Sequence, residues 1–446
     1  MSFLWDVLGV LTAYIVYPQA ERREKRQILG KLRALRAEAA EPFPLRKARA
    51  QERLAAMLEH AGRTVPYYRD LFAARHFDPT SVLRDIRYLN DLPYLTKADI
   101  QEQGRRLVSE TAQGSLHERK TGSSTGPSSI IYYDQEALDW TAAQNIQVLE
   151  WAGKRRHYRE AHLSTRFLTP LAPHDIRREA WKCFALNRAN IYTDNLEDGG
   201  LDRLWQDILQ AKARVIQGHP SSLYALACHL EARGGIHERA FDLFVSTGEM
   251  MTVKQRRTIE EVLHCRISNR YGAAELGVMA QELATDHDGS LLVSDAMVWP
   301  EVADIDTDGV GELVFTSLRN AAMPLVRYRM GDLGRLTEQA DGWRLSRLVG
   351  RVHDAVVVDG TTYPTHFIQD ILDRCGDIRD FQIAARKGQA VELRLVTAPD
   401  QWESIASAVR GNFPTLPLRR IEPEGLVFVG RRGKFRYLVE MANNAF

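Results

Sequence analysis

The pattern of apolar and polar positions predicts helices in the first part of the chain and an alternating α/β region after it. Between Glu21 and Glu110, apolar residues recur at spacings of three and four, as in LRALRAEAA and ERLAAMLEHAG. This is the period of an amphipathic helix. Beyond Thr121, short β-prone runs alternate with amphipathic helical segments. Such alternation is typical of a layered α/β sheet.

The stretch from residue 201 to residue 249 illustrates the alternation. One apolar helix face is formed by Leu201, Leu204, Trp205, Ile208 and Leu209. The run RVIQG then predicts a strand, and a second helix begins at Pro220 and ends before Gly234. The segment FDLFVSTGE returns as a strand that leads into a turn.

A compact second pattern follows Gly350: strand and turn, short helix, hairpin, second helix and a final strand pair. We therefore expect an α/β protein with a large N-terminal layered body and a small, mobile C-terminal α+β domain. The predicted divisions are a helical lead-in over residues 1–110, the body over 111–350 and the small domain over 351–446. AVVVDGTTYP, FQIAARKGQAVELRLVTA and GLVFVGRRGKFRYLVEM carry its predicted strands.

Composition narrows the function classes. The 446 residues are 44% hydrophobic and 26% charged, with a formal net charge of +1, which is ordinary for a multidomain enzyme. The 59 basic and 58 acidic residues nearly cancel, so no overall field favours nucleic acid. The four cysteines are scattered without metal-ligand spacing, and we expect reduced thiols in a cytoplasmic protein.

The apolar run over residues 3–17, FLWDVLGVLTAYIVY, stands apart. A spanning helix needs about 20 apolar residues, and a secretory signal carries its basic residues before the apolar run rather than after it, where Arg22 and Arg23 stand here. Two interpretations remain. The run is either a first helix packed on the body or an interfacial segment resting on the inner membrane surface.

The segment KTGSSTGPSS carries the densest candidate chemistry. Its hydroxyl and glycine residues form a nest of donors for phosphate oxygens: Thr121, Gly122, Ser123, Ser124, Thr125 and Gly126. It is not a Walker A loop, because Gly126 is followed by Pro127 instead of the lysine that this motif requires. Taken alone, the segment is equally well explained as a solvated Ser/Gly loop.

Further motifs follow it in order: STGE at 246–249, NRYGAAE at 269–275, YRMGD at 328–332, GRVHD at 350–354 and GKFR at 433–436. Together they resemble the adenylate-forming superfamily of acyl-CoA ligases, luciferases and peptide-synthetase adenylation domains. The run AMPLVRYRMGDLGRL and the helical lead-in are most similar to its phenylacetate-CoA ligase branch. The resemblance extends from about residue 50 to the C-terminus.

The resemblance implies that a carboxylic acid attacks the α-phosphorus of ATP to give an acyl-adenylate. The loop at Thr121–Gly126 would hold the β- and γ-phosphates, and Glu275 would ligate Mg²⁺, a hard cation that takes one or two protein carboxylates. The alternative for Glu275 is an exposed residue at the start of a helix. Tyr271 would lie against adenine, in a nucleotide-binding set with Gly248, Glu249, Asn269 and Gly272; its alternative is core packing in a β-to-α turn.

Asp332, after a glycine at the end of a predicted strand, would accept hydrogen bonds from both ribose hydroxyls, with Arg351 assisting. A surface ion pair is the alternative. Lys434, in a predicted tight turn, would meet the α-phosphate and the acid during adenylation. His353 and Asp354 would form the hinge about which the small domain swings for the thiol step; His353 departs from the Asp or Lys usual there, and Phe435 departs from the pattern around the lysine.

The acid pocket is expected among residues flanking the motifs: Trp151, Phe167, His219, Tyr224, Val245, Ala273 and Ala274. The resemblance favours an aryl or arylacetic acid, with coenzyme A preferred as acceptor over a phosphopantetheine carrier protein. Amine or hydroxyl acceptors in pigment, cofactor or surface-polymer synthesis remain alternatives, as does a non-catalytic nucleotide-binding relative at a membrane. Some relatives carry a Cys and His cluster that suggests zinc; here no cysteine occurs from Arg266 to Arg374, so no zinc is expected.

Overall fold

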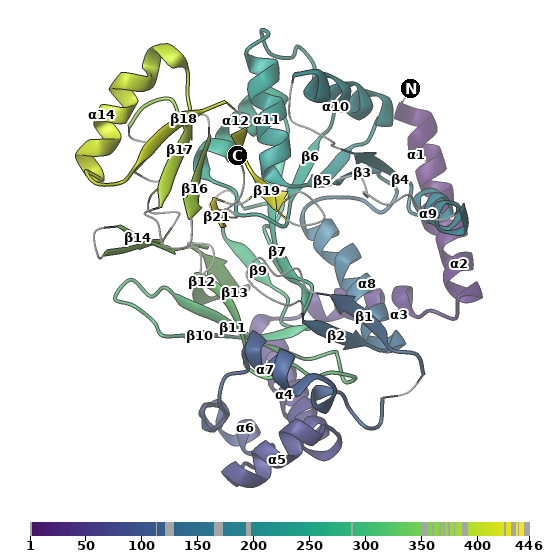
Figure 1. Ribbon diagram of the computed structural model, residues 1–446. Helices are drawn as coiled ribbons and strands as arrows, with labels where there is room; N and C mark the ends of the chain where they lie inside the picture. The colour runs from purple at the N-terminus through teal and green to yellow at the C-terminus, as the bar shows by residue number, and fades with distance from the viewer. Residues whose placement is uncertain are drawn as a thin grey trace.

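The computed structural model describes residues 2–112, 114–120, 129–164, 173–192, 198–286, 289–348, 355–358, 361–364, 368, 371–372, 375–378, 380–385, 391–422, 425–429, 434–435 and 437–440. Its first part is a series of helices (Figure 1). They are α1 (Ser2–Leu11), the π-helix η1 (Thr12–Val16), α2 (Tyr17–Arg23), α3 (Ile28–Ala39), α4 (Phe43–Thr64), α5 (Pro66–Arg75), α6 (Ser81–Arg84), α7 (Lys97–Gln103), and the 3-10 turns η2 (Ile86–Asp91) and η3 (Gly104–Leu107). This confirms the predicted helical lead-in.

Local sequence explains where several of these helices begin. Helix α4 starts with proline at its first turn, a position where the missing N–H costs nothing. Helix α7 starts with a capping box, in which Thr96 and Asp99 satisfy each other's backbone N–H groups. Helix α4 buries one apolar stripe that includes Phe43, Leu54 and Leu58, so the lead-in packs on the body through its 3.6-residue period.

Strands β1 (His117–Lys120) and β2 (Ile130–Tyr133) form an antiparallel pair, and the long helix α8 (Gln135–Trp151) follows. Asp134 caps α8 by accepting a hydrogen bond from the backbone N–H of Ala137. Helix α8 packs against α3 and strand β8, so it joins the lead-in to the main sheet.

Eleven strands of the described chain form one sheet in the order β10-β11-β12-β13-β9-β8-β7-β6-β5-β3-β4. Its parallel part contains β3 (Glu160–Ser164), β4 (Arg188–Tyr192), β5 (Val215–Gly218), β6 (Leu243–Ser246) and β7 (Arg266–Ala273), connected through α9 (Pro173–Ala185), α10 (Asp198–Ala211), α11 (Pro220–Glu231) and α12 (Val253–Leu263). The alternation of strand and helix matches the sequence prediction. Such a sheet binds ligands beyond the carboxyl ends of its strands.

The other part of the sheet is antiparallel. Its strands are β8 (Gly277–Gln281), β9 (Leu291–Val293), β10 (Val298–Ala303), β11 (Gly311–Ser317), β12 (Tyr328–Gln339) and β13 (Gly342–Ser346). The largest apolar core joins this part to the lead-in helices and α8, with Leu54, Leu58 and Phe315 among its fully buried members.

The parallel strands have a different core on each face. Side chains such as Leu163, Ile216 and Phe244 pack under α10, α11 and α12. On the opposite face, Val215, Leu243 and Val245 pack with Leu149 and Ala152 at the end of α8. This division decides which side chains can share a pocket.

Residues after 354 have their own sheet, in the order β18-β17-β16-β21. The elements are β14 (Ala355–Val358), β15 (Thr361–Pro364), β16 (Asp380–Ala385), β17 (Glu392–Val396), the 3-10 turn η4 (Pro399–Gln401), α14 (Trp402–Asn412), β18 (Leu418–Ile421), β19 (Phe428–Val429), β20 (Lys434–Phe435) and β21 (Leu438–Glu440). The predicted hairpin is β16–β17 and the predicted final pair is β19–β20; β21 is an added strand that pairs with β16. The predicted boundary between residues 350 and 351 lies outside the described residues.

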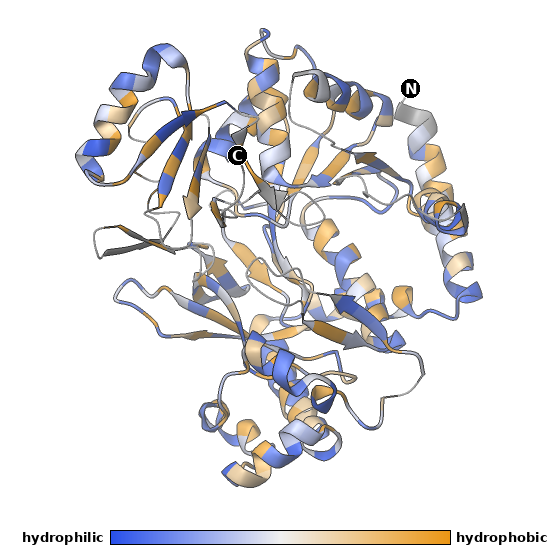
Figure 2. Ribbon diagram, viewed as in Figure 1, coloured by the Kyte–Doolittle hydropathy of each residue, from blue (hydrophilic) through white to orange (hydrophobic). Residues whose placement is uncertain are grey.

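This C-terminal part also has a separate core. Ile405 and Val409 of α14 pack with Phe381, Ile383 and Leu395 of the sheet. In Figure 2, apolar residues alternate with polar ones along these strands, as expected for a sheet with one buried face.

In the described part of the chain, no helix is long and apolar enough to cross a bilayer. The apolar run near the N-terminus forms α1 and η1, which pack on the body through small residues and through Trp5, whose ring lies under the Arg159 guanidinium. Thr12 and Ala13 are buried, as the interpretation of a packed first helix predicts.

Candidate active site

Two nucleotide-binding candidates, Tyr271 on β7 and Asp332 on β12, are in direct contact. The Tyr271 hydroxyl donates a hydrogen bond to Asp332 Oδ2 at 2.8 Å. The Tyr271 ring also lies against Phe315 of β11, with ring centroids 6.1 Å apart. The structure therefore brings two separate motifs to one place.

Asp332 does not lie at a strand end, as the sequence suggested; that expectation is wrong. It lies inside β12, where residues 330–332 face the single residue 313 of β11. Gly331 adopts a φ of +74°, and its N–H donates to Glu312 Oε1 at 3.2 Å. Such a bulge bends a strand and redirects its side chains, so the bulge directs Asp332 toward Tyr271.

Glu275, the predicted magnesium ligand, lies in the turn between β7 and β8, with its side chain half-buried. The chain forms a hairpin here, so the alternative of a helix start for Glu275 is wrong. Tyr271 does pack against the main apolar core, as its alternative supposed, but in a hairpin and not in a β-to-α turn. Tyr328 Oη is 3.5 Å from Glu275 Oε1. Among the residues that the structure describes, no basic side chain pairs with this carboxylate.

Tyr133, at the end of β2, fixes the backbone of this turn. Its hydroxyl donates to Glu275 O at 2.7 Å and to Ala274 O at 3.1 Å. Burial raises the pKa of Tyr133 to about 12, so the hydroxyl stays a donor at neutral pH. Tyr133 was not among the predicted residues, although its place just after the hydroxyl-rich segment was a usable signal.

Residues Thr121–Gly126, the predicted phosphate-binding residues, lie outside the described residues. The strands on either side of them pair with each other, with Lys120 opposite Ile130. Because Tyr133 on the second of these strands bonds the Glu275 turn, that strand ends beside the predicted metal ligand.

Gly248 and Glu249 follow strand β6 and meet His219, which follows β5. A Cβ atom at Gly248 would lie 2.6 Å from His219 Cε1, so only glycine fits. Glu249 Oε2 accepts a hydrogen bond from Ser221 N at 3.3 Å. His219 Nδ1 is buried without a hydrogen-bond partner in the described region, and Glu249 Oε1 is 3.7 Å away.

Asn269 and Gly272 hold the β7–β8 hairpin in shape. Asn269 N donates to Glu282 Oε2 at 2.8 Å, and Asn269 O accepts from Gln281 Nε2 at 3.1 Å. A Cβ atom at Gly272 would lie 2.9 Å from Gly277 O. The hairpin therefore positions Tyr271 and Glu275 rigidly.

A buried polar network, which the sequence analysis missed, lies on the α8 face of the sheet. Arg270 donates from Nε to Gln281 Oε1 at 2.9 Å and from Nη1 to Gln217 Oε1 at 3.2 Å. Its Nη2 is buried and has no partner in the described chain. Burial lowers the pKa of Arg270 to about 10, which still leaves it charged at neutral pH.

The network continues to a buried ion cluster. Gln217 Nε2 donates to Glu160 Oε2 at 3.2 Å, and Glu160 pairs with Lys154 at 3.1 Å and with His162 at 3.2 Å. Glu160 is thus already neutralised by Lys154, and no described carboxylate lies within ion-pair distance of Arg270. The signal in the sequence was a charged residue inside NRYGAAE, in the middle of a strand.

The structure separates the predicted acid-pocket residues. Val245 shares the α8 face of the sheet with Gln217 and Arg270, because β5, β6 and β7 are paired in register. Trp151 is the last residue of α8 on that side, and its carbonyl accepts a hydrogen bond from Ala284 N at 2.7 Å. Tyr224 instead belongs to the core on the opposite face. Ala273 and Ala274 lie at the hairpin turn beside Glu275.

Four further predicted residues lie outside the described residues: Phe167, Arg351, His353 and Asp354. Of Lys434, the backbone is described. It begins β20 and pairs with Val429, so it occupies a strand rather than the predicted tight turn. Its side chain is not described.

Within the described ranges, no group of three or more His, Cys, Asp or Glu side chains is arranged to hold a metal ion. The Glu275 carboxylate would nevertheless suit a magnesium ion, a hard cation that favours carboxylate oxygens. Such an ion takes one or two protein carboxylates and keeps its waters, and Glu275 is not engaged by a basic side chain in the described region.

Comparison with known proteins finds sequence relatives among phenylacetate-coenzyme A ligases. No family model matches the chain. The phenylacetate-coenzyme A ligase of Pseudomonas putida is 29% identical over 342 residues, covering 72% of this chain and 74% of that one. The phenylacetate-coenzyme A ligase of Thermus thermophilus is 28% identical over 370 residues, covering 78% and 80%.

A solved structure shares the fold. It is that of 2-hydroxyisobutyryl-CoA ligase in the postadenylation state in complex with R3-HIB-AMP, with a TM-score of 0.68, 17% identity, and coverage of 88% of this chain and 89% of that one. The chain is thus similar in sequence to phenylacetate-coenzyme A ligases over 72% and 78% of its length, and it shares its fold with 2-hydroxyisobutyryl-CoA ligase.

Proposed function

We propose that the protein activates a carboxylic acid with ATP, forming an acyl-adenylate and pyrophosphate, and then transfers the acyl group to the thiol of coenzyme A. The observation that carries the proposal is the convergence of two motifs, NRYGAAE and YRMGD. Tyr271 bonds Asp332 at 2.8 Å, and Glu275 stands four residues from Tyr271 in the same hairpin. The ligases named above support the same chemistry.

In the proposed site, Asp332 accepts hydrogen bonds from the ribose hydroxyls, and the Tyr271 ring lies against the base. Tyr271 already bonds one carboxylate oxygen of Asp332, which fixes the carboxylate before ATP arrives. Fixed acceptors lower the cost of ordering a ligand. This supports Asp332 as a ribose-binding residue.

Glu275 is the proposed ligand of Mg²⁺, held in place by the bonds from Tyr133 to its turn. When bound, the ion neutralises the phosphate charge. The hydroxyl-rich residues Thr121–Gly126 are proposed to bind the β- and γ-phosphates, because the β2 strand that follows them ends beside Glu275.

Lys434 is proposed to meet the α-phosphate and the acid carboxylate during adenylation. A mobile ammonium suits this task because catalysis here is mostly positioning and charge neutralisation. Arg351 is proposed to assist at the ribose. Residues His353 and Asp354 are the proposed hinge, where a few residues absorb the rotation of the small domain between the two half-reactions.

For the acid, we propose an aryl or arylacetic acid that carries a polar or anionic substituent. The proposed acid-binding region lies beside the buried polar network between α8 and the sheet, near Trp151. Arg270 supplies a buried guanidinium whose Nη2 lacks a partner in the described chain. Gln144 of α8 is also buried, and neither atom of its amide has a partner there. Buried polar groups without partners favour a ligand that satisfies them.

The decisive experiment is acid-dependent exchange of labelled pyrophosphate into ATP, followed by thioester formation with coenzyme A. The acid panel should pair each aryl acid with its hydroxylated or carboxylated analogue. Exchange with thioester formation supports the proposal. Exchange that yields product only with a phosphopantetheinylated carrier or an amine would assign a different acceptor, and no exchange with any acid would favour a non-catalytic nucleotide-binding protein.

A further inference from the structure

Helices α1 and η1 are oriented with their large apolar side chains outward. Val7, Val10, Leu11, Tyr14 and Ile15 are between 43% and 54% exposed. The opposite side, which packs on the body, includes small residues: Thr12 and Ala13 are buried, and a Cβ at Gly9 would lie 1.9 Å from His157 O. Trp5 also lies on the body, with the Arg159 guanidinium over its ring. The five outward side chains reverse the usual pattern of a surface helix, which turns its apolar stripe inward.

Helix α9 extends the same surface. It packs beside η1 and exposes Ile176, Trp181 and Phe184 to 55%, 51% and 43%, with the last two rings 5.6 Å apart. Figure 1 shows α1, α2 and α9 together on one side of the molecule. We call these outward residues of α1, η1 and α9 the N-terminal apolar face. Contiguous exposed apolar patches mark interaction sites.

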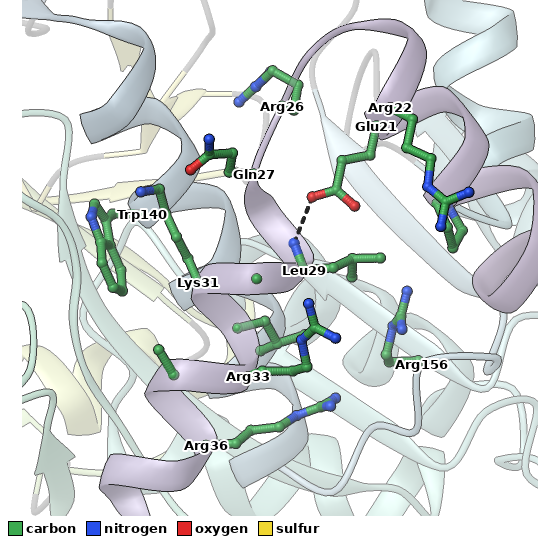
Figure 3. Close-up of a pocket in the computed structure, with 14 residues that line it drawn as sticks. Glu21, Arg22, Arg26, Gln27, Leu29, Lys31, Arg33, Arg36, Trp140 and Arg156 are labelled. Carbon is green, nitrogen blue, oxygen red and sulfur yellow. Dashed lines mark hydrogen bonds between the residues drawn. The ribbon is translucent and has the colours of Figure 1, made fainter.

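A basic cleft adjoins this face, where α2 and α3 meet Trp140 of α8 and Arg156 beyond it. It has a volume of about 650 Å³, and Figure 3 shows the side chains that line it. Its cations are Arg22, Arg26, Lys31, Arg33, Arg36 and Arg156, against the single acid Glu21.

Half of these cations are already paired. Arg26 pairs with Asp139, Lys31 with Glu136 at 3.1 Å, and Arg36 with Glu150 at 2.9 Å. For Arg22, Arg33 and Arg156, the described chain provides no carboxylate within ion-pair distance; Arg156 instead donates to Ala13 O at 2.7 Å. Glu21 is occupied as well, since its Oε1 accepts from Leu29 N at 2.7 Å. The cleft therefore retains positive charge.

We propose that the N-terminal apolar face and the basic cleft together dock the protein on the surface of an anionic lipid bilayer. An interfacial helix buries its apolar side in the headgroup region while neighbouring Arg and Lys attract anionic headgroups. The positive charge of the cleft favours an anionic bilayer over a second copy of the chain as the partner of this surface. A twofold contact with a second copy through this face would bring two basic clefts toward each other, which like charges oppose.

The proposal goes beyond the proposed ligase chemistry and is independent of it, because it concerns a surface formed by α1, η1, α2, α3 and α9. The contact would be peripheral, since no helix of the described chain can cross a bilayer. It gives the enzyme access to a membrane-bound acid, acceptor or product.

The test is co-sedimentation of the full chain with vesicles of phosphatidylglycerol and phosphatidylcholine, compared with pure phosphatidylcholine. We expect binding to the anionic vesicles that weakens with salt. Replacing Val10, Leu11 and Ile15 together by Ser should weaken binding at least about tenfold. Arg22→Glu and Arg33→Glu should each weaken it at least about fivefold. All five side chains point outward, so the fold should be retained, and far-UV circular dichroism checks this.

The matched control replaces exposed apolar residues elsewhere: Val253→Ser and Ile305→Ser, at positions 84% and 61% exposed. These should bind as the parent does. A second readout is Trp181, whose fluorescence emission should shift to shorter wavelength with anionic vesicles, a change absent in Trp181→Phe.

Failure of the parent protein to bind anionic vesicles overturns the proposal. So does equal loss of binding in the control variants. If light scattering shows a dimer that the triple Ser variant dissolves, with no vesicle binding, a second copy occupies the face and the membrane proposal is wrong. Pyrophosphate exchange is measured on the same samples, so failure of the docking and failure of the ligase activity are separately visible.

Discussion

The hydrogen bond from Tyr271 to Asp332 joins strands that are far apart in the sheet. Between β7 and β12 the strand order runs through β8, β9 and β13, four steps that span about 19 Å in a flat sheet. Yet the Tyr271 hydroxyl is 2.8 Å from Asp332 Oδ2. The sheet must therefore curl so that the bulged part of β12 returns over the β7–β8 hairpin, and this curl assembles the nucleotide site.

We expect Asp332→Ala to impair ATP use much more than Tyr271→Phe. Loss of the carboxylate removes the acceptor for two ribose hydroxyls, each bond being worth about 1.5–3 kcal/mol when one partner is charged, so kcat/KM for ATP should fall by about 100-fold or more. Tyr271→Phe keeps the ring and removes only the positioning bond, at about tenfold or less. Steady-state kinetics with varied ATP measure both.

Asp207→Ala is the matched control for these variants, because Asp207 is exposed on α10. It should leave kcat/KM for ATP unchanged. Equal losses in Asp332→Ala and Tyr271→Phe would contradict the assignment of the ribose to Asp332.

Glu275→Gln should weaken the response to magnesium. The amide keeps the size of the side chain but removes the charge that a hard cation prefers, so adenylation at limiting Mg²⁺ should fall by about 100-fold. Pyrophosphate exchange titrated with MgCl₂ measures the shift, and higher Mg²⁺ should restore part of the rate. Glu261→Gln on α12 is the control, and an unchanged Mg²⁺ dependence in Glu275→Gln would remove Glu275 from the metal site.

Lys434→Ala should separate the two half-reactions. Adenylation should fall by about 100-fold or more because a positioned charge on the α-phosphate is lost, whereas thioester formation from supplied acyl-adenylate should persist. Exchange and single-turnover thioester assays measure the two steps. Lys182→Ala, at an exposed position of α9, serves as control. If both half-reactions fall equally, the lysine acts in some other way.

The residues of the nucleotide site could be predicted from the sequence, but their arrangement could not. Motifs identified Tyr271, Asp332 and Glu275 because each has a local pattern. Their proximity depends on the sheet's curl and on the bulge around Gly331, which arise from pairing with distant strands. The segment GAAE resembles a helix start locally. It forms part of a hairpin because β7 pairs with β8, and this pairing depends on the tertiary structure rather than on the local sequence.

Arg270 shows a second limit. A charged residue in a short β-prone run is usually exposed, and nothing near it in the sequence says that α8 covers this face. Its partners Gln217 and Gln281 come from β5 and β8. Tyr224, by contrast, is expected in the acid pocket from the sequence, although helix α11 turns it into the opposite core.

Glu160→Gln should destabilise the protein in a pH-dependent way. Burial alone would raise the pKa of Glu160, but the Lys154 ammonium and the His162 ring lower it below its ordinary value. Its contribution is therefore fully present above the ordinary carboxyl pKa of about 4.3 and is lost as the pH falls through the folded-state pKa. At pH 7 the variant leaves Lys154 unpaired, at a cost of about 3 kcal/mol.

Thermal unfolding from pH 7 to pH 3 tests this, with the parent and variant compared at each pH. The difference in the midpoint temperature of unfolding between the parent and Glu160→Gln should become smaller toward pH 3. Adding Lys154→Met to Glu160→Gln should recover stability at pH 7, since no buried charge is then left alone. A difference that stays constant across the range would mean that Glu160 is not ionised in the folded protein.

Arg270→Met should change which acids are used rather than how ATP is used. Methionine keeps much of the side-chain volume but cannot satisfy a polar substituent, so kcat/KM for substituted aryl acids should fall by about 10- to 100-fold. For the unsubstituted acids it should stay the same or rise, because an unpaired guanidinium no longer faces an apolar ring. The ratio of kcat/KM for substituted acids to kcat/KM for unsubstituted acids does not depend on the fraction of folded enzyme. A loss of stability from breaking the bonds to Gln217 and Gln281 therefore leaves this ratio unchanged. Arg203→Met on α10 controls for the substitution itself, and an unchanged ratio in Arg270→Met would show that the guanidinium serves the buried network alone.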